Sequence, residues 1–366
     1  MAEHKATNGA QLTPSSSSVP SPTQPSTARI VFLGEPGHDP GNVQTDEEDE
    51  DEDEEFEEES GDPLADYPDE TEELDLIHSR ISSLDNLRLG RFAAHLRRLC
   101  LRQNFILFLD PATFHLLTKL EELDLYDNKI KGIGDALVKC SELATLDLSF
   151  NLLKAVPDTL EHLPSLKTIY FVQNRITKIT GLHGVGATLR SLELGGNRIW
   201  VIEGLDALVN LEELWLGKNK ITKLENLSAL KSLKILALQS NRLTKIEGLD
   251  DLENLEELYL SHNGVERLEN LEHNLKLTTL DVGNNFVPAL ENISHLKSLT
   301  ELWINNNKIP TLQDLEKQLG GLPELETVYL EGNPCQLAEG VHYRRKIMLA
   351  LPRLKQIDAT CAHPSL

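Results

Sequence analysis

One eleven-residue pattern recurs through most of the chain, with leucine or another apolar residue at positions one, four, six and eleven and asparagine at position nine. Three clear copies are LEELDLYDNKI, LEELWLGKNKI and LTELWINNNKI, which begin at Leu120, Leu211 and Leu299. The asparagines, 22 to 26 residues apart, are Asn104, Asn128, Asn151, Asn174, Asn197, Asn219, Asn241, Asn263, Asn285, Asn307 and Asn333. With a degenerate copy that begins at Thr71, the chain holds twelve copies, and this period predicts a solenoid of stacked repeats.

The pattern is the signature of leucine-rich repeats, and it predicts an α/β solenoid, a horseshoe of about 12 repeats with a C-terminal cap. Each L-x-x-L-x-L segment is expected to form a strand of a parallel concave sheet, with its leucines in the core. The asparagine supplies donors and an acceptor to backbone groups that the inward turn buries, so Asn307 is structural, whereas Asn305 and Asn306 are expected to be exposed. Short 3-10 or helical turns are expected on the convex side, with a helical turn or two over Leu312–Gly320.

Composition divides the chain into three predicted parts. Residues 1–69 form a Ser/Pro-rich and acidic tail. This tail is predicted to be disordered, because the acidic run from Asp46 to Glu59 repels itself and has little apolar surface to bury. Residues 70–333 hold the leucine-rich repeats, and residues 334–366 are interpreted as the C-terminal cap. In the cap, Tyr343–Thr360 (YRRKIMLALPRLKQIDAT) supplies apolar residues to cover the last repeat.

Charge restricts the partners of this chain. The net charge is −24, and residues 1–70 alone hold 20 acids and two bases. Such acidity argues against nucleic acid, which needs Lys/Arg stripes, and favours a protein with a positive patch. Neither a signal peptide nor an apolar segment of about 18 residues is apparent, so no secretion and no membrane span are expected. The four cysteines lack metal-ligand spacing, and reduced thiols in the cytosol or nucleus are expected.

Function is expected on the concave face, because alternate side chains of a strand point to opposite sides and the third and fifth positions face away from the core. The fifth-position residues are Asp75, Cys100, Asp124, Asp147, Tyr170, Glu193, Trp215, Ala237, Tyr259, Asp281, Trp303 and Tyr329. Five are acids, five are Tyr or Trp, and none is a base. The third positions add five acids and one base, Arg98. This face, roughly 50 Å long at about 4.8 Å per strand, is predicted to dock a large basic protein.

The aromatic residues of this column indicate an interface. Tyr and Trp favour strands, and this preference alone is the simpler explanation for their presence. It does not explain why two of the three tryptophans and three of the six tyrosines fall in one column of twelve residues. Trp303, beside Glu301, is therefore interpreted as an exposed anchor of a protein–protein interface and not as a core residue.

No catalytic or cofactor-binding signature accompanies the repeats. The sequence has no G-x-x-x-x-G-K-[ST] loop, no G-x-S-x-G elbow and no H-E-x-x-H pair. Paired carboxylates on the concave face can bind a cation or transfer protons, but an open sheet offers no desolvated pocket. We therefore expect a chain that is not an enzyme and that uses no cofactor, metal or small-molecule substrate.

Several stretches match beyond the generic repeat, among them LCLRQN, ELDLYDN, LWLGKNKITKL, LQSNRLTKIEGL, ELYLSHNG, LENISHL, LETVYLEGNP and YRRKIMLALPRLKQIDAT. Over roughly Glu72 to Ala362 the chain resembles the leucine-rich-repeat regulatory subunit 7 family of protein phosphatase 1. The resemblance implies a nuclear and cytoplasmic regulatory subunit that grips the phosphatase catalytic subunit with its concave acids and rings. We expect such a subunit to act at mitosis in the cell cycle. The partner-binding residues that it implies are Asp147, Tyr170, Glu193, Trp215, Asp281, Glu301, Trp303 and Tyr329. The irregular segments Phe105–Lys119 and Gly181–Ala187 and the acidic tail depart from the family pattern.

Other interpretations stay open at this point. A leucine-rich-repeat scaffold of another intracellular complex, such as a splicing or an axonemal (cytoskeletal) complex, would have a similar cap and different partners. An extracellular receptor would need a signal peptide and cysteine-rich caps. In the tail, Arg29-Ile30-Val31-Phe32 resembles the basic–Val/Ile–x–Phe docking peptide of many phosphatase 1 regulators, which adds a strand to a sheet edge; an accidental apolar spot is the alternative.

Overall fold

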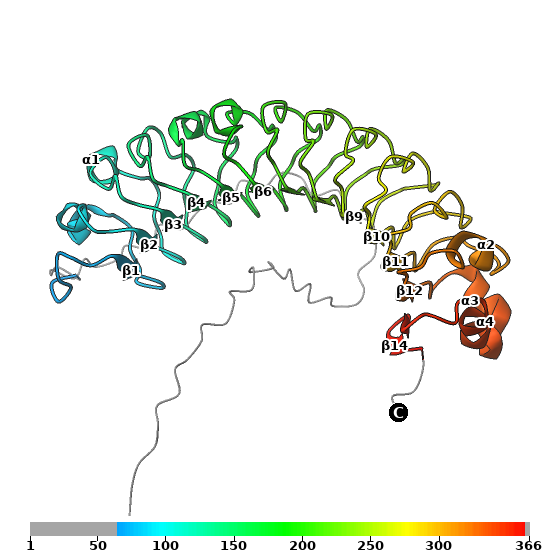
Figure 1. Cartoon of the computed structure of the whole chain (residues 1–366). Helices are drawn as coiled ribbons and strands as arrows, with labels where there is room; N and C mark the ends of the chain where they lie inside the picture. Colours follow the sequence, from blue (N-terminus) through cyan, green and yellow to red (C-terminus); the bar gives the residue numbers. More distant parts are fainter. Residues whose placement is uncertain (1–63, 363–366) are drawn as a thin grey trace, which may run out of the picture. The chain divides into compact units, whose positions relative to one another are not determined.

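The computed structural model describes residues 64–362, and within this range the repeats form a curved solenoid whose strands line the inner side (Figure 1). Twelve three-residue strands of the described range pair in parallel, in chain order and without a crossover. They are β1 (Glu73–Asp75), β2 (Arg98–Cys100), β3 (Glu122–Asp124), β4 (Thr145–Asp147), β5 (Thr168–Tyr170), β6 (Ser191–Glu193), β7 (Glu213–Trp215), β8 (Ile235–Ala237), β9 (Glu257–Tyr259), β10 (Thr279–Asp281), β11 (Glu301–Trp303) and β12 (Thr327–Tyr329). The predicted leucine-rich-repeat horseshoe is confirmed.

The middle residue of every strand lies in the core, as the alternation of a strand requires. Leu214, Leu236 and Leu258 occupy equivalent places in β7, β8 and β9 and are fully buried. Burying each such leucine contributes about 1.5–3 kcal/mol. Because each repeat places its leucine next to the same leucine of the preceding repeat, one continuous core follows the solenoid and fixes the register of the sheet.

The ninth-position asparagines form the expected ladder. The amide nitrogen of Asn219 donates to the carbonyl oxygens of Leu194 at 2.9 Å and Leu216 at 3.0 Å, and its oxygen accepts from the Ile199 amide at 3.0 Å. Each asparagine therefore ties two repeats together. In the repeat LTELWINNNKI, Asn307 is buried and bonded in this way, and Asn306 is exposed as expected.

Asn305 departs from the expectation of full exposure, because its side chain is half-buried. Asn306 has the left-handed conformation, with φ of 54°. The same left-handed turn occurs at the eighth position of other repeats, at Gln173 and Lys218 among others. This turn redirects the chain from the strand into the core, where the asparagine can bond the backbone groups that the turn buries.

The helices on the convex side of the described range are short and occur in the longer repeats; between Asn197 and Asn307, where the asparagines are 22 residues apart, the described turns hold no helix. The helices of these turns are η1 (Asp85–Leu87), η2 (Leu89–Phe92), α1 (Pro111–Phe114), η3 (Asp158–His162), η4 (His183–Val185) and α2 (Leu315–Leu319). Helix α1 begins after Asp110, whose carboxylate accepts from the amides of Ala112 and Thr113 at 3.1 and 3.0 Å, an N-cap. Helix α2 falls inside the segment where a helical turn was expected.

After Asn333 the chain leaves the repeat pattern and forms the elements α3 (Pro334–Glu339), η5 (Gly340–His342), α4 (Tyr343–Ala350), β13 (Gln356–Ile357) and β14 (Thr360–Cys361). Strand β13 pairs in parallel with β12, and β14 turns back antiparallel to it. Asp358 accepts from the amides of Leu330 and Glu331 at 2.8 and 2.9 Å, so a carboxylate here bonds the backbone of the last repeat. The predicted three-part division stays a prediction, because the tail lies largely outside the described residues.

Candidate functional site

The strand register brings the predicted site residues into one row on the concave side of the sheet. Asp147, Tyr170, Glu193 and Trp215 are the last residues of four successive strands, β4 to β7, and they pair in order. The other predicted residues lie in β10 to β12, where they occupy the third and fifth positions of the repeat: Asp281, Glu301, Trp303 and Tyr329. Strands β8 and β9 separate these two groups.

Between β5 and β11 the fifth-position residues alternate in a symmetric order. Glu193 lies between Tyr170 and Trp215, and Asp281 lies between Tyr259 and Trp303. At the centre is Ala237, over which the rings of Trp215 and Tyr259 stack with centroids 6.4 Å apart and planes at 20°. The small alanine makes this stacking possible, because neighbouring strands lie only about 4.8 Å apart. We call the third- and fifth-position residues of strands β5 to β12 the concave row.

Two acids of the concave row are less exposed than expected. Glu193 is 8% exposed and Asp281 is 5% exposed, whereas the flanking rings are half-buried. The expectation that every fifth-position side chain faces solvent is therefore wrong at these two residues, and also at Ala237, which is 1% exposed. Each of the two acids lies between aromatic residues of the adjacent strands, and its shorter side chain is less accessible than the rings beside it.

This burial changes how the acids ionise. Burial raises the pKa of Glu193 to about 7, with further contributions from the negative charges of Asp147 and Glu213. Burial also raises the pKa of Asp281, although hydrogen bonds from Ser261 and from the Gly283 amide act in the opposite direction. Near neutral pH the row therefore holds carboxyl groups that gain strongly from a nearby positive charge.

Neighbouring polar groups orient the rings of the concave row. The indole nitrogen of Trp303 donates to Glu301 at 3.2 Å, and its ring contacts that of Tyr329 with centroids 5.0 Å apart. The Tyr259 hydroxyl donates to Glu257 at 2.6 Å. Both carboxylates are two residues before the aromatic residue on the same strand, so they lie on the same face. Fixed rings lose little conformational entropy when a partner covers them.

The list of site residues from the sequence omitted two members of this arrangement, Tyr259 and Glu257. Tyr259 completes the alternation around Asp281, and Glu257 repeats the contact that Glu301 makes with Trp303. The sequence contained the signal for both, because Tyr259 is a fifth-position residue and Glu257 a third-position residue. Gln356 of β13, which donates to the Tyr329 hydroxyl at 2.6 Å, follows no repeat position and gave no such signal.

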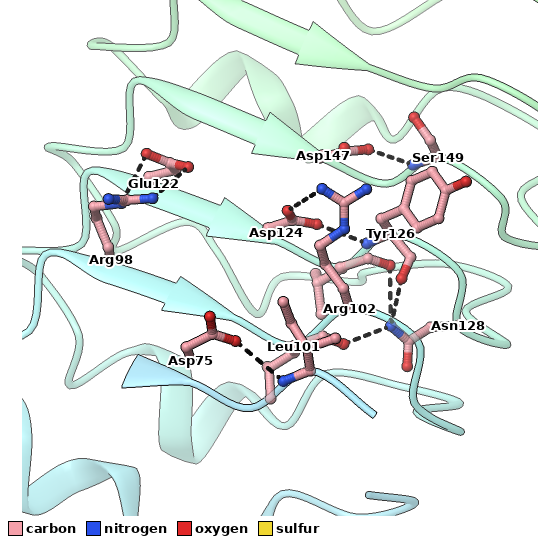
Figure 2. Close-up of polar contacts among 12 residues, drawn as sticks. Asp75, Arg98, Leu101, Arg102, Glu122, Asp124, Tyr126, Asn128, Asp147 and Ser149 are labelled. Atoms are coloured by element: carbon pink, nitrogen blue, oxygen red, sulfur yellow. Dashed lines mark hydrogen bonds and ion pairs between the residues drawn. The ribbon is translucent and has the colours of Figure 1, made fainter. Parts of the chain in front are cut away.

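The N-terminal strands of the same face are arranged differently. Arg98 lies between Glu73 and Glu122, with nitrogen–oxygen distances of 3.4 and 3.1 Å. Figure 2 shows the next arginine, Arg102, against Asp124, at 3.2 Å. Three of the four acids of β1 to β3 therefore have a base of this chain beside them, and the fourth, Asp75, accepts from the Ile77 amide.

Arg102 also covers an aromatic side chain beside these strands. Its guanidinium carbon lies 4.3 Å from the centre of the Tyr126 ring, and that ring contacts Phe150 with centroids 4.8 Å apart. In Figure 2 the Asp147 carboxylate is turned to Ser149, whose amide donates to it at 2.8 Å. Asp147 thus marks the boundary between the paired acids and the concave row.

Among residues 64–362, no group of three or more His, Cys, Asp or Glu side chains is arranged to hold a metal ion. No helix of the described range has both the length and the apolar character needed to cross a bilayer. What the concave row offers is a strip of oriented rings with carboxyl groups between them.

Family profiles named for leucine-rich repeats match most of the repeat region. A profile described as "Leucine rich repeat" matches residues 94–153 and 141–199, and one described as "Leucine-rich repeat" matches residues 187–281. A third, "Leucine Rich repeats (2 copies)", matches residues 275–317. Together the matches run without a gap from residue 94 to residue 317, which is more than half of the chain.

Several curated proteins share parts of the sequence. The chain is 47% identical over 80 residues to protein phosphatase 1 regulatory subunit SDS22 of Saccharomyces cerevisiae, which covers 22% of this chain and 23% of the yeast protein. It is 37% identical over 145 residues to the protein phosphatase 1 regulatory inhibitor subunit PPP1R7 homolog of Arabidopsis thaliana, covering 39% and 43% of the two chains. With protein phosphatase 1 regulatory subunit 7 of Xenopus tropicalis, the identity is 64% over 47 residues, 13% of each chain. Each match spans less than half of the relative's length.

Solved structures agree on the fold. A leucine-rich-repeat protein of Leptospira interrogans is 26% identical, with a TM-score of 0.59 over 73% of this chain and 73% of that one. An internalin of Listeria monocytogenes is 22% identical, with a TM-score of 0.61 over 79% and 87% of the two chains. The second likeness concerns the fold alone.

Proposed function

Because this chain belongs to the leucine-rich-repeat proteins, and among them is similar to SDS22 and regulatory subunit 7, we propose that it is a non-enzymatic regulatory subunit of a type 1 Ser/Thr protein phosphatase. In this proposal the concave row binds the phosphatase catalytic subunit. The proposed subunit acts in the nucleus and cytoplasm. It controls the phosphatase by holding it and not by chemistry of its own.

The observation that carries the proposal is the absence of bases along β5 to β12. No third- or fifth-position residue of these strands is Lys or Arg. None of the acids at these positions forms an ion pair with any residue of the described range: Glu193, Glu213, Glu257, Asp281 and Glu301. A strip of acids without bases of its own favours a partner that supplies them.

The burial of the acids explains how such a partner gains affinity. A lysine or arginine placed over Glu193 would lie between the rings of Tyr170 and Trp215, where attraction to the ring faces adds to the ion pair. The surrounding rings exclude water, so the interaction is stronger than at an exposed site. The arrangement around Asp281 repeats the same chemistry four strands further on.

A matched pair of double variants tests the proposal by pull-down of the phosphatase catalytic subunit. Glu301→Ala with Trp303→Ala removes an acid and a tryptophan from the concave row. Glu203→Ala with Trp200→Ala removes the same two residue types from the lateral side of the solenoid. We expect the first variant to weaken binding by about 2–4 kcal/mol, as for an interface hot spot, which is roughly 30- to 1,000-fold in Kd. The second variant should bind as the unchanged chain does.

Undiminished binding by a folded Glu301→Ala, Trp303→Ala variant would remove the concave row from the proposal. Co-purification from native cells checks the partner separately. Recovery of splicing or axonemal proteins without a phosphatase would favour a scaffold of another complex. The Arg29–Phe32 peptide lies outside the described residues, and its docking role stays a prediction.

A further inference from the structure

Trp200 is the tryptophan that the concave row does not use, and its surroundings differ from those of the other two. Its side chain is 47% exposed. The Lys220 nitrogen lies 5.5 Å from the centre of its ring, and the guanidinium carbon of Arg242 lies 4.8 Å away. Two bases from the next two repeats therefore hold the indole as a fixed, partly exposed platform on the lateral side of the solenoid.

Trp200 borders a line of bases at the tenth position of four successive repeats. Arg198 donates its backbone amide to Ile176 at 2.8 Å, and the amides of the equivalent residues bond the preceding repeat at 2.8 to 2.9 Å. These bonds place the tenth-position residues one strand spacing apart. We call this line the basic row; its members are Arg175, Arg198, Lys220 and Arg242.

The basic row has no acid of the described range to neutralise it. None of its four members forms an ion pair within residues 64–362. Two of the three bases that lie three positions later in the repeat are paired, since Lys178 pairs with Glu203 at 3.8 Å and Lys223 pairs with Glu225 at 3.3 Å; Lys245 has no ion pair within residues 64–362. The lateral side thus holds one row of bases in which two of three are paired with acids, and one row without such partners beside an exposed tryptophan.

We infer that the basic row and Trp200 form a second docking site, which takes an extended acidic segment of another protein. Three strand spacings of about 4.8 Å make the row about 14 Å long, while alternate residues of an extended chain are about 6.6 Å apart. Carboxylates at residues i, i+2 and i+4 of an extended segment therefore match the row in length. Arginine and lysine bind carboxylates through charge-assisted hydrogen bonds, and Trp200 supplies an apolar surface at the side.

The neighbouring charges favour a short acidic peptide over a nucleic acid. Glu203, Glu225 and Glu247 form a parallel line of acids, five positions after the base in three of the four repeats of the basic row. A phosphate backbone is charged at every nucleotide and would extend past the row into this line, where the charges repel. A peptide with carboxylates on one side only avoids this contact.

Fluorescence anisotropy with the full-length protein tests the site, using a labelled peptide Glu-Ser-Glu-Ser-Glu-Ser-Glu as the probe. A variant with Arg198→Ser, Lys220→Ser and Arg242→Ser removes three charges of the basic row. The matched control, with Lys178→Ser, Lys223→Ser and Lys245→Ser, removes three charges from the adjacent row. We expect the first variant to lose about tenfold or more in affinity, because charge-assisted hydrogen bonds are lost, and the control to lose much less. Trp200→Ala alone should weaken binding severalfold.

Equal losses in the two triple variants would overturn the proposal, because they would indicate general electrostatic attraction. Tighter binding of a twelve-nucleotide oligouridine, with the same dependence on the basic row, would overturn it in favour of RNA. The acidic run Asp46–Glu59 is also a possible occupant. If the probe binds only after the acids of that run are changed to Asn and Gln, the assignment to a separate partner fails. The concave-row variant Glu301→Ala, Trp303→Ala should bind the probe normally, which keeps this test separate from the proposed phosphatase contact.

Discussion

The two ends of the concave face share one scaffold and differ in charge. In β1 to β3 three of the four acids lie beside two arginines of the same chain, Arg98 and Arg102. In β5 to β12 the third and fifth positions hold acids and rings, with no ion pair to any described base. Strand length, parallel register and the asparagine ladder are the same in both regions.

This difference indicates on which strands a basic partner gains the most binding free energy. An acid that already has an arginine beside it must give up that contact before it can bind another base, so little is gained. A buried acid without a base, such as Glu193, has lost contact with water, and no opposite charge of the described range offsets the cost of that loss. The N-terminal strands are thus interpreted as scaffold and the later strands as the docking surface.

The largest expected effect is on stability, and it comes from removing an asparagine of the ladder that both regions share. Asn128→Ala, in the N-terminal part, and Asn285→Ala, in the later part, each leave several buried backbone groups without a partner. Each substitution should lower the free energy of unfolding by about 3 kcal/mol or more. Urea denaturation measures both. A cost several times larger in one region would contradict a uniform scaffold.

A somewhat smaller effect is expected when a base is placed among the acids of the later strands, as Arg98 and Arg102 lie among those of the N-terminal strands. Trp215→Arg places a base next to Glu193 and removes a ring. We expect a loss of about 2–3 kcal/mol in affinity for the phosphatase catalytic subunit, measured by calorimetry. Cys100→Arg makes the equivalent change in β2, at the same position of the repeat, and is expected to change the affinity little. Similar losses in both variants would show that the two regions do not differ in function.

A smaller effect is expected from pH. Because the pKa of Glu193 is raised to about 7, the group is largely protonated at pH 6 and ionised at pH 8. A bound cation would lower this pKa, so affinity should rise with pH through this range, by at most about tenfold for one group. Glu193→Gln should flatten the dependence, whereas Glu122→Gln, next to Arg98, should keep it. An unchanged slope in Glu193→Gln would exclude Glu193 as the cause.

The smallest effect is expected when an arginine is removed from the N-terminal region. Arg102→Gln leaves Asp124 without its base and makes the face more negative. Exposed charges act mainly on association rates, so the association rate with a basic partner should rise by about two- to threefold at low salt. Stopped-flow measurement at two ionic strengths checks this. A slower association would mean that Arg102 itself contacts the partner.

The sequence predicted the fold well because its information is periodic. Each asparagine and each middle leucine has the same neighbours one repeat away, so a correct alignment of the copies already defines the sheet. The same alignment brought Asp147, Tyr170, Glu193 and Trp215 into one row. What it did not convey was the effect of neighbours on burial: Glu193 was assessed alone, although its flanking rings were visible in the same column.

Other features depended on long side chains and on segments outside the repeat. Arg102 is at the seventh position of its repeat, yet its guanidinium contacts Asp124, the fifth-position acid of the next repeat. Gln356 reaches Tyr329 from beyond the last repeat. Neither contact follows from the alternation of a strand, because the side chain spans several ångströms and its direction depends on packing.

The three tryptophans allow a direct test of whether the concave row binds the phosphatase catalytic subunit. Hydroxyl-radical footprinting, read out by mass spectrometry, measures the oxidation of each one with and without the phosphatase catalytic subunit. We expect Trp215 and Trp303 to become protected in the complex, while Trp200 keeps its reactivity. Protection of Trp200 with unchanged oxidation of Trp215 and Trp303 would contradict this expectation.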